Sequence, residues 1–335
     1  MFDIQLLIGG KDLPASDGKT FERRNPMTGE IASRAAAATI EDANAAVDAA
    51  AEAFPAWSGL GPNERRAKLL KAADLLEQRT PDVVNLMMRE TGATAPWAGF
   101  NAHLAANMLR EAASMTTQVG GEVIPSNEVT RMAMAIRQPA GVVVGIAPWN
   151  APVILGVRAV AVALACGNTV VLKASELCPG THRLVGEVLR DAGLPAGAIN
   201  VVTNAPDDAA NVVEALIAHR AVRRVNFTGS TKVGRIVAQF AARHLKPVLL
   251  ELGGKAPLVV LDDADLDAAV SAAAFGAFMN QGQICMSTER IVIDESVADA
   301  FVTKLGAKAA ALPAGDPKGN VVLGSMINRE AGKRV

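Results

Sequence analysis

The sequence contains no tyrosine and few other aromatic residues, and its charges nearly cancel. Aromatic residues make up 4% of the 335 residues, and 33 Lys and Arg face 34 Asp and Glu, for a formal net charge of -1. Proteins that bind nucleic acid usually carry a basic face with aromatic side chains on which bases stack. The composition therefore gives no indication of a nucleic-acid partner.

Cysteine and histidine are also scarce. Cys166, Cys178 and Cys285 are odd in number and scattered, so they form neither a disulfide framework nor a metal-ligand spacing. The four histidines are isolated from one another: His103, His182, His219 and His244. We therefore expect a protein of a reducing compartment, the cytoplasm, with no bound metal.

Long uninterrupted apolar runs are missing as well. The N-terminus lacks the basic segment and apolar core of a signal peptide. Residues 141–167 carry one charge, Arg158, and are long enough to span a bilayer. Pro148, Asn150 and Pro152 interrupt this stretch, which divides into a strand, a turn and a helix. A membrane protein is therefore not expected.

The chain is large and half apolar, and its second half alternates between two kinds of segment. A chain of 335 residues with 50% hydrophobic content can bury the cores of two or more domains. Strands are expected at 141–147, 169–173, 198–202, 222–227 and 247–252, with helices at 180–191, 206–219 and 231–242. This order predicts an α/β fold with a parallel sheet covered on both faces. Such sheets bind ligands beyond the carboxyl ends of their strands.

The first half is mostly helical in pattern. Apolar residues recur at helical spacing over 40–54, 64–80 and 81–90, and these helices are expected to cover the sheet. Residues 119–138 show two apolar stretches on either side of Pro125-Ser-Asn127, which predicts a β-hairpin.

Three segments carry groups that suit acyl transfer. They are Pro148-Trp-Asn150, Leu250-Glu251-Leu-Gly-Gly-Lys255 and Asn280-Gln-Gly-Gln-Ile-Cys285. A thiol supplies a nucleophile, a carboxylate supplies a base for water, and an amide supplies a donor for an oxyanion. Cys285 lies in a loop rich in Gly and Gln, whereas the other two cysteines fit a small buried apolar role.

Two of these residues also have ordinary structural interpretations. Glu251 ends an apolar strand, where burial can raise the pKa of a carboxyl group toward that of a useful base, although alone it would be a solvated or paired charge. Asn150 precedes an apolar helix and could serve as its N-cap.

In this order and with these separations, the three segments resemble the aldehyde dehydrogenase family over the whole chain. The resemblance implies that the Cys285 thiolate adds to an aldehyde carbonyl. It implies that the Asn150 amide and the Cys285 backbone N–H hold the oxyanion, and that Glu251 activates the water that hydrolyses the thioester.

A glycine turn, Phe227-Thr-Gly229-Ser230-Thr-Lys-Val-Gly234, leads from a strand into a helix. It lacks the Lys-Ser or Lys-Thr ending of a P-loop and does not match G-x-G-x-x-G, so by itself it is a weak indication. It does match the family's G-S-T-x-x-G turn, which implies that Gly229 and Ser230 hold a dinucleotide diphosphate.

The resemblance also implies the remaining cofactor contacts. Lys173 and Glu176 would bind the adenosine ribose, with Ile146, Trp149 and Leu252 as further contacts. A carboxylate at Glu176 accepts bonds from free ribose hydroxyls and repels a 2'-phosphate, so NAD is preferred over NADP. Without the resemblance, Lys173 and Glu176 would be ordinary surface charges.

The family pattern divides the chain into domains. A Rossmann-like cofactor domain comprises 1–117 and 140–252, a β-hairpin oligomerisation arm comprises 118–139, and an α/β catalytic domain occupies 253–335. The arm implies a homodimer or homotetramer, although an ordinary edge hairpin has the same pattern. Family members usually exceed 400 residues, so the catalytic domain is expected to be truncated, without the downstream Glu-x-Phe-Gly-Pro segment.

The substrate follows from apolar side chains near the three segments. They are Trp97, Phe100, Ala151, Ile284 and Met286. The sequences of residues 97–101, 110–114 and 283–290 look most like those of the salicylaldehyde, benzaldehyde and vanillin dehydrogenases. This resemblance implies an aromatic aldehyde substrate. An aliphatic or semialdehyde substrate, an inactive nucleotide-binding fragment and a thiol-dependent esterase remain as alternatives.

Overall fold

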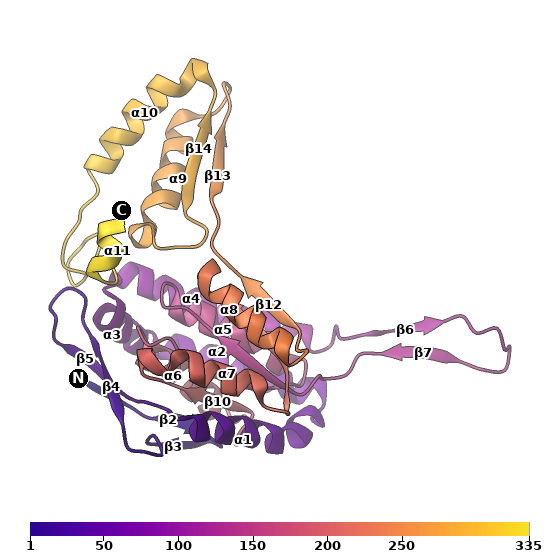
Figure 1. Ribbon diagram of the computed structural model, residues 1–335. Helices are drawn as coiled ribbons and strands as arrows, with labels where there is room; N and C mark the ends of the chain where they lie inside the picture. The colour runs from indigo at the N-terminus through magenta and orange to yellow at the C-terminus, as the bar shows by residue number, and fades with distance from the viewer. Residues whose placement is uncertain (335) are drawn as a thin grey trace.

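The computed structural model describes residues 1–334 and is built around a seven-stranded sheet of order β12-β11-β8-β9-β10-β2-β3 (Figure 1). Five neighbouring strands run parallel: β12 (Val248–Glu251), β11 (Val222–Thr228), β8 (Val142–Ile146), β9 (Thr169–Lys173) and β10 (Ile199–Val202). All five were expected from the sequence, to within one or two residues at each end. The parallel α/β fold is therefore confirmed.

The N-terminal strands were not expected. β2 (Leu6–Ile8) pairs antiparallel with β10, and β3 (Lys11–Leu13) pairs antiparallel with β2, so the sheet is not purely parallel. A separate three-stranded sheet contains β1 (Phe2–Ile4), β5 (Ile31–Ala36) and β4 (Thr20–Arg24). Three of these five strands have only three residues, which is too short for a readable alternation of polar and apolar side chains.

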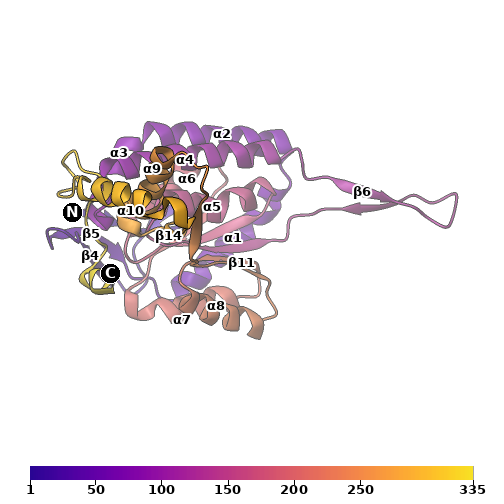
Figure 2. The same ribbon diagram turned by 90° about the horizontal axis from the view of Figure 1, so that it is seen from above.

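Helices cover both faces of the main sheet, as Figure 2 shows from above. One face packs against α1 (Ile40–Ser58), α7 (Ala209–Ala218) and α8 (Thr231–Arg243). The other packs against α2 (Pro62–Gln78), α3 (Thr80–Thr91), α4 (Ala95–Met115), α5 (Pro152–Ala165) and α6 (Pro179–Asp191). Successive side chains of β8 point to opposite faces of the sheet, so Val143 enters the core on one face and Val144 the core on the other.

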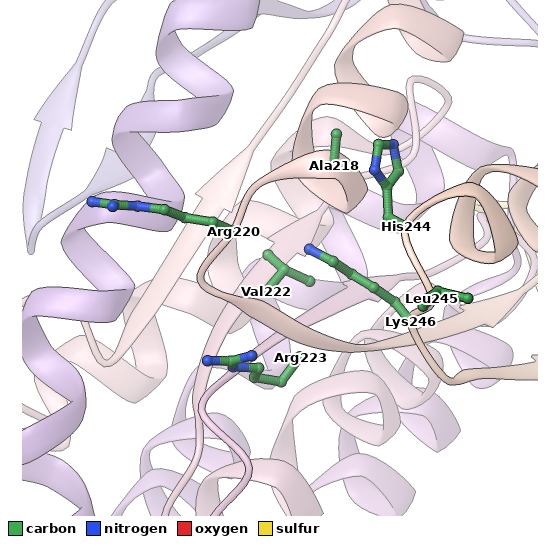
Figure 3. Close-up of a pocket in the computed structure, with 7 residues that line it drawn as sticks. All are labelled: Ala218, Arg220, Val222, Arg223, His244, Leu245 and Lys246. Carbon is green, nitrogen blue, oxygen red and sulfur yellow. The ribbon is translucent and has the colours of Figure 1, made fainter.

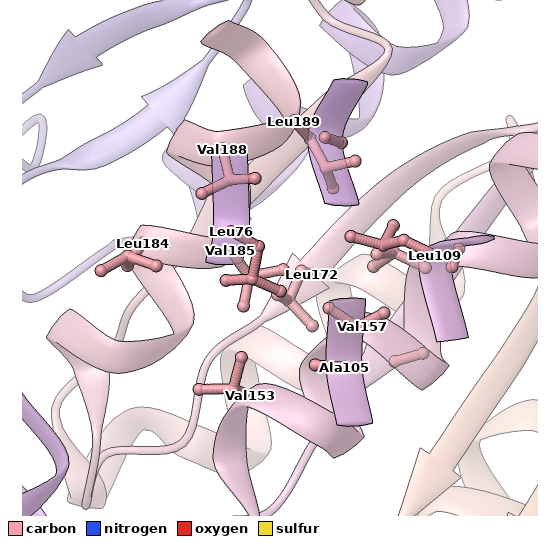
Figure 4. Packing of buried hydrophobic residues seen from close by; sticks show 14 of the residues in the cluster. Leu76, Ala105, Leu109, Val153, Val157, Leu172, Leu184, Val185, Val188 and Leu189 are labelled. Atoms are coloured by element: carbon pink, nitrogen blue, oxygen red, sulfur yellow. The ribbon is translucent and has the colours of Figure 1, made fainter. Parts of the chain in front are cut away.

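The larger core joins residues that lie far apart in the chain. Figure 4 shows Leu172 of β9 surrounded by Leu109 of α4, Val157 of α5 and Val185 of α6. All four side chains are buried, so the sheet cannot shift relative to these helices without opening cavities. Within residues 1–334, no helix combines the length and the apolar character needed to cross a membrane.

The chain after β12 forms a smaller unit. It contains β13 (Ala256–Val260) and β14 (Thr288–Ile293), which pair in parallel, with α9 (Leu266–Phe278) and α10 (Glu295–Ala310) packed beside them. A short 3-10 helix, η2 (Met279–Gly282), follows α9, and another, η1 (Pro206–Asp208), precedes α7. The last helix, α11 (Arg329–Arg334), returns toward the N-terminal sheets (Figure 1).

The predicted hairpin is present as β6 (Gly121–Ile124) and β7 (Ala133–Ile136). It projects away from the body of the protein as a two-stranded arm in both views (Figures 1 and 2). Val123, Met134 and Ile136 are all more than half exposed on this arm. Its role in oligomerisation stays a prediction.

A buried carboxylate fixes the start of α6. Glu90 is fully buried and accepts bonds from the backbone N–H groups of Gly180 and Thr181, both at 2.9 Å, and from the hydroxyls of Ser33 and Thr181 at 2.5 and 2.7 Å. Burial raises the pKa of Glu90 above its ordinary value, while these four donors act in the opposite direction. A negative group at a helix N-terminus is also favoured by the helix dipole.

We predict that Glu90→Gln lowers the free energy of unfolding by about 1–3 kcal/mol, because an amide leaves one buried backbone N–H without an acceptor. The folded state holds the Glu90 proton more tightly than the unfolded state, so the contribution of Glu90 to stability is full below the ordinary glutamate pKa and declines as pH rises from there through the raised pKa of the folded state. The loss caused by the substitution is therefore larger at pH 5 than at pH 8.

Urea unfolding at the two pH values measures this difference. Glu52→Gln, at an exposed position of α1, is the matched control and is expected to change stability by less than about 0.5 kcal/mol. Equal stability of the wild-type protein and the Glu90→Gln variant would contradict the role given to this carboxylate.

Candidate active site

The register of the parallel strands brings several predicted residues to one edge of the sheet. Lys173 at the end of β9 pairs with Ile146 at the end of β8, and Ile146 pairs with Phe227 of β11. Thr228, the next residue of β11, pairs with Glu251 at the end of β12. The segments that follow these four strands therefore begin side by side, as ligand sites of parallel sheets do.

The turn after β8 carries Asn150 and is held from two directions. The carbonyl oxygen of Asn150 accepts bonds from Trp97 Nε1 of α4, at 3.1 Å, and from Asn280 Nδ2, at 3.0 Å. Asn150 Nδ2 donates to the carbonyl oxygen of Gln283, at 2.9 Å. The loop that carries Cys285 is thus docked on the Asn150 turn, although 133 residues separate Asn150 from Gln283.

Asn150 is not the N-cap of α5. Ala151 occupies that position and no side chain caps the helix. The Asn150 amide nitrogen has two hydrogens, of which one is used toward Gln283. Among residues 1–334, no acceptor pairs with the second hydrogen.

The cysteine loop has an unusual backbone. Asn280, Gln281 and Gly282 have φ values of 49°, 58° and 71°, a left-handed conformation that non-glycine residues adopt at a cost of about 1–3 kcal/mol each. Hydrogen bonds offset this strain: the Gln283 amide donates to the Asn280 carbonyl, and the Gln281 amide donates to the Ser325 carbonyl at 2.7 Å. The strained segment leads directly to Cys285.

The three cysteines differ in accessibility, as the sequence predicted. Cys285 is exposed, Cys166 is half-buried and Cys178 is fully buried. Burial raises the pKa of the Cys166 thiol, and raises that of Cys178 well above its usual value. Cys285 is therefore the most exposed of the three thiols.

The burial expected around Glu251 is absent. Glu251 is exposed, and so are Gly253 and Gly254 after it. β12 is the edge strand of the sheet, and its side chains alternate: Val248 and Leu250 pack against the core on one face, while Leu249 and Glu251 face solvent on the other. The hydrophobic pattern identified the strand correctly but not its position at the edge.

The glycine turn after β11 begins α8. Ser230 is the N-cap, and its hydroxyl accepts a bond from the Val233 N–H at 3.3 Å. A side chain at Gly229 would lie 2.5 Å from the Phe227 ring, and one at Gly234 would lie 2.6 Å from Leu252. A Cβ at either glycine would therefore force a neighbouring side chain to shift, so glycine suits the close packing of the strand end against the helix, and the first turn of α8 has N–H groups without helical acceptors.

Lys173 and Glu176 form an ion pair at the end of β9. Lys173 is buried and Glu176 is partly buried. Burial alone would raise the pKa of Glu176, but the charge and hydrogen bond of Lys173 and a bond from Asn204 hold it below its ordinary value. These residues are therefore not the ordinary surface charges that the sequence allowed.

Two residues at this end of the sheet were missed from the sequence. Asn204 Nδ2 donates to Glu176 Oε1 at 3.1 Å. His182 is fully buried, and its Nδ1 accepts a bond from the Ser175 N–H at 3.0 Å. Burial lowers the pKa of His182 to about 4, so it is neutral at physiological pH. Asn204 could have been noticed because it lies two residues after a predicted strand, but nothing local marks His182.

The expected substrate residues are divided between interior and surface. Trp97 and Ala151 are buried, and Ile284 packs against the larger core. Phe100 stacks on Trp97 with ring centroids 5.5 Å apart and is 45% exposed, while Met286 is 77% exposed. The structure thus brings Trp97 and Ile284 near Asn150 but leaves Met286 facing solvent.

Ile146 is buried under the strand ends, while Trp149 and Leu252 are half-buried. Within residues 1–334, no group of three or more His, Cys, Asp or Glu side chains is arranged to hold a metal ion.

A separate hollow lies at the opposite end of the strands. It has a volume of about 310 Å³ and is lined by residues that precede β12 or lie at the start of β11, among them Arg220, Arg223, His244 and Lys246 (Figure 3). Lys246 Nζ donates to the carbonyl of His219, just beyond the C-terminus of α7, where a cation is favoured by the helix dipole. Lys246 therefore has a structural partner at this end of the sheet.

Known proteins resemble the chain along its whole length. The model of the aldehyde dehydrogenase family matches residues 13–335. The vanillin dehydrogenase of Pseudomonas fluorescens is 68% identical over 336 residues, which cover 100% of this chain and 70% of that protein. The salicylaldehyde dehydrogenase of Pseudomonas sp. (strain C18) is 50% identical over 333 residues, which cover 99% of this chain and 69% of that protein.

Solved structures agree with these relatives. The salicylaldehyde dehydrogenase of Pseudomonas putida G7, complexed with salicylaldehyde, superposes with a TM-score of 0.98 at 49% identity, covering 100% of this chain and 69% of that one. An NAD-dependent benzaldehyde dehydrogenase from Corynebacterium glutamicum superposes with a TM-score of 0.93 at 38% identity, covering 97% and 71%. With this fold, this arrangement of strand ends and these relatives, the chain belongs to the aldehyde dehydrogenase family.

Proposed function

We propose that this aldehyde dehydrogenase oxidises an aromatic aldehyde to the carboxylic acid, with Cys285 as the nucleophile and NAD as the electron acceptor. The observation that chiefly supports the proposal is the docking of the cysteine loop on the Asn150 turn through two side-chain amides. This contact joins an accessible thiol to an amide donor. Relatives that act on vanillin and salicylaldehyde support the aromatic substrate.

The residues at the strand ends fit NAD. Glu176 offers carboxylate oxygens, Lys173 offers an ammonium group, and the turn at Gly229 and Ser230 offers the N–H groups of a helix N-terminus to a diphosphate. When bound, NAD accepts the hydride that leaves the substrate carbon. Ile146, Trp149 and Leu252 would line its nicotinamide side. The solved neighbours include NAD-dependent enzymes, which agrees with this set of residues.

Different residues of the chain carry out the successive steps of the reaction. The Cys285 thiolate donates an electron pair to the aldehyde carbon, and a C–S bond forms as the carbonyl oxygen becomes an oxyanion. The free N–H of the Asn150 amide and the backbone N–H of Cys285 stabilise that oxyanion. One such donor typically lowers the barrier by about 3 kcal/mol.

After oxidation, the acyl group remains on Cys285 as a thioester. Glu251 takes a proton from water, and the water oxygen attacks the acyl carbon. The C–S bond breaks, the carboxylic acid leaves and the Cys285 thiolate is restored. The exposure of Glu251 leaves room for water to approach it.

Trp97 and Phe100 form a stacked aromatic pair, and the Trp97 ring is fixed by its bond to the Asn150 carbonyl. An aromatic ring of the substrate can pack against such a surface. We place the enzyme in the cytoplasm, which suits its three free cysteines. We also propose a homodimer or homotetramer in which the exposed apolar arm β6–β7 packs on a second copy.

We predict that Cys285→Ala reduces vanillin-dependent NADH formation to background and leaves the dissociation constant for NAD unchanged, because covalent capture must precede oxidation. Absorbance of NADH and calorimetric NAD binding measure the two quantities. Cys166→Ala, at a half-buried thiol, is the control and should keep full activity. Activity of Cys285→Ala within about tenfold of wild type would rule out this thiol as the nucleophile.

For Glu251→Gln we predict a burst of about one NADH per site followed by slow turnover, since the amide keeps the shape of the side chain but cannot take a proton from water. Stopped-flow absorbance separates the burst from the steady rate. Glu289→Gln, also exposed but located on β14, should behave like wild type. Loss of the burst together with turnover would instead assign Glu251 to activation of the thiol.

A further inference from the structure

The two oxygens of the Glu176 carboxylate have different surroundings. Oε1 accepts bonds from Lys173 Nζ and from Asn204 Nδ2, the latter at 3.1 Å. Within residues 1–334, no hydrogen bond from another residue reaches Oε2. One oxygen is therefore held by the protein, and the other remains for a ligand.

Asn204 is a buried donor whose orientation is set by acceptors alone. Its side chain is 0% exposed, and Nδ2 donates both to Glu176 Oε1 and to the Ala205 carbonyl, the latter at 2.8 Å. These two acceptors determine which end of the amide is the nitrogen. Asn204 Oδ1 is buried without a partner among the described residues, which destabilises the fold. The Asn204 side chain therefore donates two hydrogen bonds, although its buried oxygen makes no stabilising contact.

The position of Asn204 lets it act on Glu176 from a second strand. Lys173 ends β9 and Asn204 lies two residues beyond β10, and the two strands pair so that Val202 faces Lys173. A lysine ammonium is a point charge on a flexible stem, so it holds a carboxylate without fixing its plane. The buried amide of Asn204, just beyond the neighbouring strand, adds a hydrogen bond of defined direction. Together the two donors restrict rotation of the Glu176 carboxylate.

We infer that Asn204 is a specificity-determining residue for the cofactor, because it holds Glu176 with Oε1 occupied and Oε2 open to the ribose hydroxyls. The inference rests on the proposed use of NAD. A free 2'-hydroxyl donates to an open carboxylate oxygen, whereas a 2'-phosphate is repelled by it. Loss of the Asn204 donor releases the carboxylate and weakens both effects.

A double-mutant cycle on cofactor binding tests the inference. Dissociation constants for NAD and NADP are measured by calorimetry for the wild-type chain, Asn204→Leu, Glu176→Gln and the double variant. We expect Asn204→Leu to weaken NAD binding by about fivefold or more when Glu176 is present, and by less than about twofold in the Glu176→Gln background. NADP affinity should change less, so the preference for NAD falls.

Asn204→Ala provides a second variant that removes the N–H donors without adding bulk to this buried position. The loss of NAD affinity should equal that for Asn204→Leu, because both variants lack the donor to Glu176 Oε1. Thermal unfolding of each variant shows which of them remain folded. The Ala variant keeps the test valid if the Leu variant does not fold.

Two outcomes would overturn the inference. Equal weakening of NAD binding in both backgrounds would mean that Asn204 acts on the cofactor without Glu176, and unchanged NAD affinity would mean that it has no part in binding. Failure of the wild-type chain to bind NAD is a different result, because it would overturn the proposed function itself.

Discussion

The parallel pairing of β8, β9, β11 and β12 is the constraint on which the rest of the structure depends. Parallel strands end at the same edge, so their register decides which side chains become neighbours. The Asn150 turn, the Lys173–Glu176 pair, the glycine turn and Glu251 each follow one of these strands. Residues spread over 100 positions of sequence thereby reach one edge, and Cys285 joins them because its loop docks on the Asn150 turn.

Polar contacts behind this edge hold its loops in place. Glu90 fixes the first turn of α6, and His182 accepts the Ser175 N–H within the loop that carries Glu176. The Glu90 carboxylate and His182 Nδ1 are buried and hydrogen-bonded, as most buried polar groups are. Cys285 and Glu251, the groups to which we assign the chemistry, are exposed. The buried hydrogen bonds therefore hold the loops of the site in place, while Cys285 and Glu251 stay accessible from solvent.

Local patterns predicted the fold well, and they predicted less about the environment of each site residue. The strand at 169–173 was anticipated in full, because a run of apolar residues between turn signals has few other interpretations. The strands β2 and β3 were missed because three residues carry no period. Glu90 looks like a surface charge in sequence, since the donors that surround it come from positions 57 and about 90 residues away. The burial expected at Glu251 was wrong, because no local pattern shows which face of a strand the other elements leave uncovered.

The central claim is that the acyl group of the substrate is carried by Cys285. The most direct measurement is to mix the protein with vanillin and NAD, quench in acid within the first turnover and map the peptides by mass spectrometry. The account predicts a thioester on the peptide that contains Cys285, with its mass raised by that of the acyl group less one hydrogen, and no adduct on the peptides of Cys166 or Cys178. Acid production with the acyl group on another residue, or with none on Cys285, would contradict it.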